Sequence, residues 1–148
     1  MGWSGEHDLG QLVRQRHGPR AVLIGQTTHH GTVSAASDWG EEVRTQRVRP
    51  GLPGSFEELF HEVGVPRALY VLRGGGELTQ VLRPARLERA IGVLYRPDTE
   101  RQSHYFQARL SDQFDAVIHL DETRAVQPLD RTSGFEEEDA PETYPTGM

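Results

Sequence analysis

The densest group of side chains that could do chemistry lies in residues 25–32, which read Gly-Gln-Thr-Thr-His-His-Gly-Thr. Three threonine hydroxyls and the imidazoles of His29 and His30 supply hydrogen-bond donors, acceptors and a general base active near pH 7. Ligands bind in loops at the carboxyl ends of strands in α/β sheets, and an apolar run at 21–25 precedes this segment. A binding site and a strand-to-strand turn are equally good interpretations. Adjacent side chains of an extended chain point to opposite faces, so His29 and His30 are not expected to hold one metal ion together.

A second polar segment, residues 96–106, follows another apolar run at 91–95. Four of its side chains are of types found in catalytic and binding sites: Glu100, Arg101, His104 and Tyr105. We favour a functional site, because two such loops can converge above one sheet. The structural alternative is a surface ion pair between Glu100 and Arg101 and a half-buried, hydrogen-bonded His104.

His119 and Asp121 lie two residues apart on a predicted strand and therefore share one of its faces. With a third ligand they could bind zinc, which takes three protein ligands in most catalytic sites. No third ligand is evident, so a structural histidine is the preferred interpretation. A metal-dependent hydrolase that uses His29, His104 and His119 is an alternative.

The composition excludes several classes of function. The 148 residues carry a net charge of −6 and contain no cysteine, which rules out disulfides, thiolate nucleophiles and Cys-ligated metal centres. Seven of the acidic residues lie in 122–148, so the remainder is nearly neutral and has no basic stripe for nucleic acid. Neither a phosphate-binding loop nor the Gly-x-Ser-x-Gly motif of serine hydrolases occurs. Without a membrane span or a signal peptide, we expect no membrane partner and a cytoplasmic location.

The elements that position these residues follow from capping signals and apolar periodicity. Asp8 begins one helix that ends at Gly18, and Ser55 with Glu58 forms a capping box for a second helix over 56–63. We expect a third helical region at 78–89, broken around Pro84, and strands at 21–25, 32–37, 43–48, 68–73, 91–95 and 116–121. This order predicts an α/β fold, a partial open sheet with flanking helices.

The same segments carry a likeness to a known family. Long motifs match in order along essentially the whole chain: Gly25…Thr28-His29…Gly31-Thr32-Val33…Ala35-Ala36…Trp39, and residues 52–57, 88–97, 100–106, 113–119, 121–125 and 142–147. In these motifs the chain resembles the C-terminal part of the erythromycin esterase family.

The resemblance implies hydrolysis of a carboxylic ester, in the best-known members the macrolactone of macrolide antibiotics, and hence a part in antibiotic resistance. It implies that a histidine base activates water, with no cofactor and no obligatory metal. His29 and His104 match family motif positions and are the predicted catalytic residues. The predicted substrate-binding residues are Thr28, Thr32, Glu100, Arg101 and Tyr105. The family's principal catalytic histidines and carboxylates would precede Met1.

We therefore expect residues 1–131 to be the C-terminal part of an erythromycin-esterase-like domain, followed by an acidic tail at 132–148. Such a part would be incomplete, and weakly active or inactive alone. Its expected partners are a small-molecule ester substrate and either a second copy of the chain or a separate N-terminal chain. The alternative function is a non-catalytic binding or interaction module that pairs with itself or with such a chain.

Overall fold

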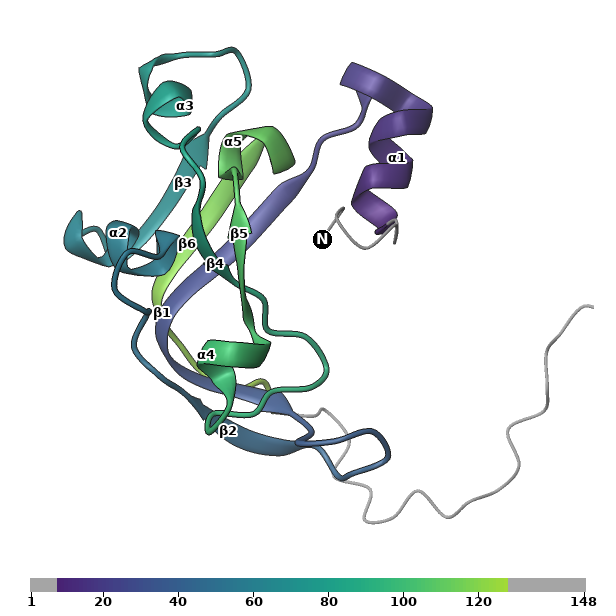
Figure 1. Cartoon of the computed structure of the whole chain (residues 1–148), viewed down its shortest axis with the longest axis vertical. Coiled ribbons are helices and arrows are strands. Elements are labelled where there is room, and N and C mark those ends of the chain that lie inside the picture. Colours follow the sequence, from purple (N-terminus) through teal and green to yellow (C-terminus); the bar gives the residue numbers. More distant parts are fainter. Residues whose placement is uncertain (1–7, 128–148) are drawn as a thin grey trace, which may run out of the picture.

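The computed structural model describes residues 8–127, which form two sheets and several short helices (Figure 1). The main sheet has the strand order β2-β1-β6-β3, and a separate two-stranded sheet pairs β4 with β5. The strands are β1 (Ile24–Ala35), β2 (Arg44–Val48), β3 (Arg67–Val71), β4 (Arg86–Arg89), β5 (Tyr105–Ala108) and β6 (Ala116–Thr123). The helices are α1 (Leu9–His17), α2 (Phe56–Glu62), α3 (Glu77–Val81), α4 (Glu100–Ser103) and α5 (Leu110–Gln113), with a 3-10 turn at Gly18–Arg20. The predicted α/β fold with a partial open sheet is confirmed.

β1 is one long, bent strand that includes the segment predicted as a polar loop. Its first part pairs parallel with β6, and its last part pairs antiparallel with β2. The strand curves between these parts (Figure 1). Gly31 has a φ of 126°, and a Cβ there would lie 2.1 Å from the carbonyl oxygen of Thr123, so only glycine fits. The prediction of a loop at 25–32 is wrong, because these polar residues pair with neighbouring strands through their backbones.

Both predicted N-caps are confirmed. The carboxylate of Asp8 accepts from the backbone N–H of Gln11 at 2.7 Å, and α1 ends at Gly18, whose φ is 52°. The hydroxyl of Ser55 accepts from the backbone N–H of Glu58 at 3.2 Å, and α2 follows.

Two other predicted elements differ in the structure. Residues 91–95 form no strand, and Leu94 makes only an isolated bridge to Ala36. The helix predicted over 78–89 ends at Val81, and β4 follows Pro84. Proline cannot continue a helix, and the residues beyond it find backbone partners in β5 instead.

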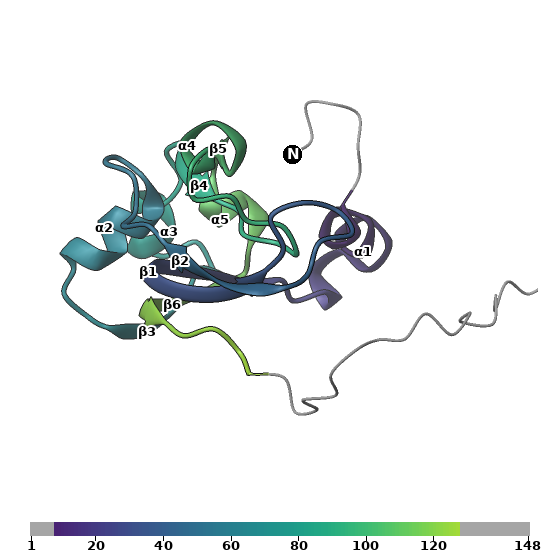
Figure 2. The same ribbon diagram turned by 90° about the horizontal axis from the view of Figure 1, so that it is seen from below.

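The core lies on one face of the main sheet. Phe56 and Phe60 of α2 pack with buried residues of the sheet and of the covering elements: Leu72, Leu82, Ala108, Leu110 and Val117. Seen from below, α2, α3, α5 and the β4–β5 pair all lie on this side (Figure 2).

No helix or strand of residues 8–127 covers the opposite face of the sheet, which carries exposed apolar side chains. Ile24, Leu69 and Val71 are 54%, 61% and 60% exposed there. Of the strand predicted at 21–25, only Ile24 and Gly25 lie in β1, and Ile24 faces outward on this side. Among residues 8–127, no helix has both the length and the apolar character needed to cross a bilayer. The predicted acidic tail lies outside the described residues.

Candidate functional site

Four histidines and one aspartate converge where β1, β6 and α2 meet. We call this group the histidine cluster: His29 and His30 from β1, His61 from α2, and His119 and Asp121 from β6. The parallel pairing of β1 with β6 puts Thr28 beside Leu120 and His30 beside Glu122, so His29 and Asp121 fall between these pairs. The cap at Ser55 begins α2 in the position that brings His61 over both strands.

His61 links the two strands. Its ring stacks on that of His29, with 3.8 Å between the ring centroids and 4° between the planes. Its Nδ1 lies 2.7 Å from Oδ1 of Asp121, at hydrogen-bond distance. The side chain of His61 is 45% exposed, so this aspartate-oriented imidazole is open to solvent.

His29 and His30 point toward each other, against the sequence-based expectation. Their Nδ1 atoms are 3.0 Å apart, and with a carboxylate oxygen of Asp121 they form a group whose ligand atoms all lie within 4.8 Å. The alternation rule does not hold in this part of β1, where the strand curves and Gly31 has a positive φ. The expectation that the two imidazoles point to opposite faces is therefore wrong.

Burial and neighbouring charges shift the pKa values of His29 and Asp121 in this cluster. Burial lowers the pKa of His29, and the neighbouring His61 lowers it further. Burial would raise the pKa of Asp121, but the hydrogen bond from His61 and the charges of the surrounding histidines hold it below its ordinary value. Both shifts favour the forms that ligate metals and accept protons.

His119 closes the cluster on its buried side. As predicted, it lies on the same face of β6 as Asp121. Its Nδ1 is 2.9 Å from Oγ1 of Thr27, and the ring is fully buried. Burial lowers its pKa, which Asp121 only partly offsets. Its Nε2 has no hydrogen-bond partner among residues 8–127, and it faces Oδ1 of Asp121 from 3.6 Å, beyond hydrogen-bond distance.

A second polar group, the Arg89 network, lies directly under the bend of β1. It comprises Arg89 of β4, Glu100 of α4, Tyr95 and Glu57. Arg89 donates through Nη1 to Glu100 at 2.8 Å and through Nη2 to the backbone oxygens of Thr28 and His29, at 2.5 and 2.9 Å. The hydroxyl of Tyr95 donates to the same oxygen of Glu100 at 2.8 Å. Arg89 therefore fixes the backbone that carries His29.

The predicted residues of the second polar segment lie apart from the histidine cluster. Glu100 is buried and pairs with Arg89, so the alternative of a surface pair with Arg101 is wrong; Arg101 is exposed on α4. The hydroxyl of Tyr105 accepts from the backbone N–H of Leu52 at 3.0 Å. Nδ1 of His104 donates to the carbonyl of Ala90 at 3.0 Å, and its Nε2 accepts from the backbone N–H of Arg96 at 3.2 Å. Both ring nitrogens of His104 thus form hydrogen bonds with backbone groups. Catalysis by His104 stays a prediction.

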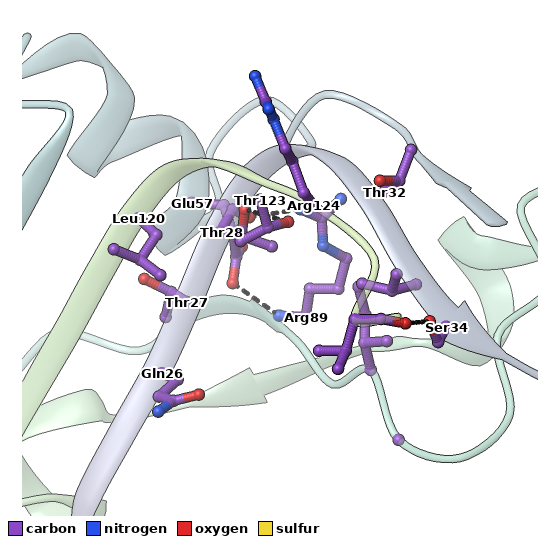
Figure 3. Close-up of a pocket in the computed structure, with 14 residues that line it drawn as sticks. Gln26, Thr27, Thr28, Thr32, Ser34, Glu57, Arg89, Leu120, Thr123 and Arg124 are labelled. Carbon is purple, nitrogen blue, oxygen red and sulfur yellow. Dashed lines mark hydrogen bonds between the residues drawn. The ribbon is translucent and has the colours of Figure 1, made fainter. Parts of the chain in front are cut away.

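Thr28 and Thr32 line an open cleft of about 470 Å³ between β1, the segment after β4 and the end of β6 (Figure 3). Thr28 also donates to the backbone oxygen of His30 at 3.1 Å, and Thr32 accepts from the backbone N–H of Ala125 at 2.9 Å. None of the histidines lines this cleft, although Thr28 and Leu120 of its wall directly adjoin His29 and His119 in the sequence.

Sequence reasoning missed His61 and Arg89. His61 directly follows the apolar positions of α2, and nothing in its spacing links it to residues 29 or 121. Arg89 was assigned to a helix, which hid its position under β1. Only a prediction of residues 86–89 as a strand would have placed Arg89 correctly.

Comparison with solved structures places this fold inside larger chains. A succinoglycan biosynthesis protein matches with a TM-score of 0.66 and 25% sequence identity, over 80% of this chain and 28% of that chain. A Bacillus cereus protein matches with a TM-score of 0.64 and 20% identity, over 78% of this chain and 28% of that one. The chain thus corresponds to little more than a quarter of the length of each.

The sequence profile of the erythromycin esterase family matches residues 1–123. The match includes the strands and the helix that bear the histidine cluster, as well as the Arg89 network. This chain belongs to the erythromycin esterase family.

Proposed function

We propose that the chain is the C-terminal portion of an erythromycin-esterase-like hydrolase that cleaves carboxylic esters, macrolactones among them, with histidine-activated water. The chain contributes the histidine cluster and one wall of the substrate cleft. Segments equivalent to the rest of the longer relatives contribute the remaining catalytic groups. Alone, the chain is a weak catalyst.

The pair formed by His61 and Asp121 carries this proposal. When Nδ1 of His61 bears the proton, it donates to the aspartate and leaves Nε2 free to take a proton from water. The carboxylate fixes the ring and stabilises the imidazolium that results, as the aspartate of a catalytic triad does. The hydroxide formed attacks the ester carbonyl, the tetrahedral intermediate expels the alkoxide, and the imidazolium returns the proton to that alkoxide.

The remaining support comes from the surroundings of this pair. His29 is stacked on His61 and its backbone is held by Arg89, so the base has a rigid support. The hydroxyls of Thr28 and Thr32 line the adjoining cleft, and Thr32, whose oxygen accepts from Ala125, has its proton available to donate to a polar, oxygen-rich substrate.

The test compares two histidine variants of the purified chain. Hydrolysis of a p-nitrophenyl ester is followed by absorbance, and opening of erythromycin is followed by the mass of one added water. We expect slow hydrolysis by the unchanged chain and a rate about 100-fold lower for His61→Gln, the lower end of the contribution of a general base. His17→Gln removes an exposed imidazole at the end of α1 and is the matched control, with no change expected. Equal rates for the unchanged chain and His61→Gln would refute the proposal.

The uncovered face of the main sheet favours a second candidate function, an interaction module. Ile24, Leu69 and Val71 form an exposed apolar surface of the kind that marks protein interfaces. A self-pairing chain would sediment as a dimer at micromolar concentration, and Leu69→Glu would return it to a monomer. Sedimentation as a monomer at all concentrations would remove self-pairing.

A further inference from the structure

We infer that His29, His30 and Asp121 form a binding site for a divalent transition-metal ion of the zinc class. This inference goes beyond the proposed hydrolysis and does not require it, since a metal site can serve structure or catalysis.

The distances among the three ligand groups suit such an ion. The Nδ1 atoms of His29 and His30 are 3.0 Å apart, and the group that includes the Asp121 carboxylate lies within 4.8 Å. Zinc binds imidazole and carboxylate at about 2.0–2.2 Å in a tetrahedral shell, which separates neighbouring ligand atoms by roughly 3.3 Å. To admit the ion, the imidazoles therefore need to separate by a few tenths of an ångström, and the carboxylate of Asp121 needs to approach them from within 4.8 Å.

The fold holds these ligands in place. Arg89 binds the backbone oxygens of Thr28 and His29, and the backbone N–H of Asp121 donates to the carbonyl of Pro66 at 2.9 Å. Gly31, which follows His30 directly, has a positive φ of 126° and packs so closely on Thr123 that only glycine fits there. Ligands with a fixed backbone lose little entropy when they bind.

His61 lies beside the site and contacts two of its three ligands. It hydrogen-bonds to Oδ1 of Asp121 and stacks on His29, so it orients one ligand of each strand. Ligating carboxylates in metal sites are themselves hydrogen-bonded in this way. His61 is thus a positioning residue for the metal, not a ligand.

The ligand atoms indicate which metal ion fits the site, and their exposure indicates how the ion enters. Two imidazole nitrogens and one carboxylate suit zinc, cobalt or nickel, whereas magnesium and calcium prefer oxygen ligands. His29 is buried, but His30 and Asp121 are partly exposed, so an ion can enter from solvent. Three protein ligands leave a fourth tetrahedral position for water.

Calorimetric titration of the metal-free 148-residue chain with Zn²⁺, and optical titration with Co²⁺, test the inference. We expect one ion per chain, the visible absorption of tetrahedral cobalt, and no heat with Mg²⁺. His30→Gln and Asp121→Asn should each raise the Kd for Zn²⁺ at least 100-fold, because each removes a ligand. His61→Gln should raise it about tenfold, the smaller effect of an outer partner. His17→Gln is the control and should bind as the unchanged chain does.

The results separate this inference from the proposed hydrolysis. Stoichiometric binding that depends on His30 and Asp121 supports the metal site even where no ester is cleaved. Absence of Zn²⁺ binding, or binding unchanged in both ligand variants, overturns it even where hydrolysis depends on His61. Circular dichroism of each variant establishes that it is folded before its Kd is compared.

Discussion

The Arg89 network and the histidine cluster are neighbouring polar groups with opposite characters. Arg89 and Glu100 are only 1% and 2% exposed, and each terminal nitrogen of Arg89 makes two hydrogen bonds. In the histidine cluster, the rings of His29 and His61 stack on each other, and His61 is open to solvent. Nε2 of His119 has no hydrogen-bond partner in the described part of the chain.

This difference separates a structural role from a functional one. The buried Arg89–Glu100 pair, closed by hydrogen bonds to Tyr95 and to backbone oxygens, stabilises a single conformation of the backbone around it. A half-open group of imidazoles has ring nitrogens that can accept a proton or bind an ion. The Arg89 network fixes the backbone of β1, and the histidine cluster presents side chains that can react or bind.

The largest expected effect is the loss of the paired guanidinium. Arg89→Met leaves Glu100 as a buried, unpaired carboxylate and frees the bend of β1, which should lower the free energy of unfolding by about 3–5 kcal/mol. Urea denaturation followed by circular dichroism measures this. The double variant Arg89→Met/Glu100→Gln removes the unpaired charge and should recover part of the loss. A loss below about 1 kcal/mol in the single variant would contradict the structural role of the network.

Glu88 adjoins Arg89 in the sequence but contrasts with the Arg89–Glu100 pair, because its buried Oε2 has no hydrogen-bond partner among the described residues. Burial and the nearby charge of Glu57 raise the pKa of Glu88 from 4.5 to about 7. The unfolded chain then releases this proton at lower pH than the folded chain, so stability falls as the pH rises from about 4.5 to 7.

Glu88→Gln should abolish this dependence. The variant and the unchanged chain should be equally stable near pH 4, and the variant should be more stable by up to about 3 kcal/mol at pH 8. Denaturation at a series of pH values measures the difference. Parallel pH profiles for the two chains would show that Glu88 titrates normally in the folded state.

The sequence predicted the local signals of this fold better than its long-range pairing. The carboxylate of Asp8 and the hydroxyl of Ser55 each cap a helix by accepting from the backbone N–H three residues later. This short spacing can be read directly from the sequence. Residues 25–32 look like a loop because they are polar, yet tertiary pairing on both sides makes them a strand. The approach of His61 to Asp121 joins residues 60 positions apart, and only the packing of α2 on the sheet sets it.

His104 provides the smallest and most discriminating effect, since the sequence places it with the catalytic candidates and its contacts resemble those of the Arg89 network. His104→Ala removes two hydrogen bonds to backbone and the contact of the ring with Tyr95, whose centroid is 5.1 Å away. We expect unfolding to cost about 1–2 kcal/mol less, with the rate of ester hydrolysis per folded molecule unchanged. Denaturation and the hydrolysis assay, run on the same preparation, separate the two quantities. A fall in rate that exceeds the loss of folded protein would instead return His104 to the catalytic site, because a residue that only ties two loops together changes how much enzyme is folded and not how fast each folded molecule works.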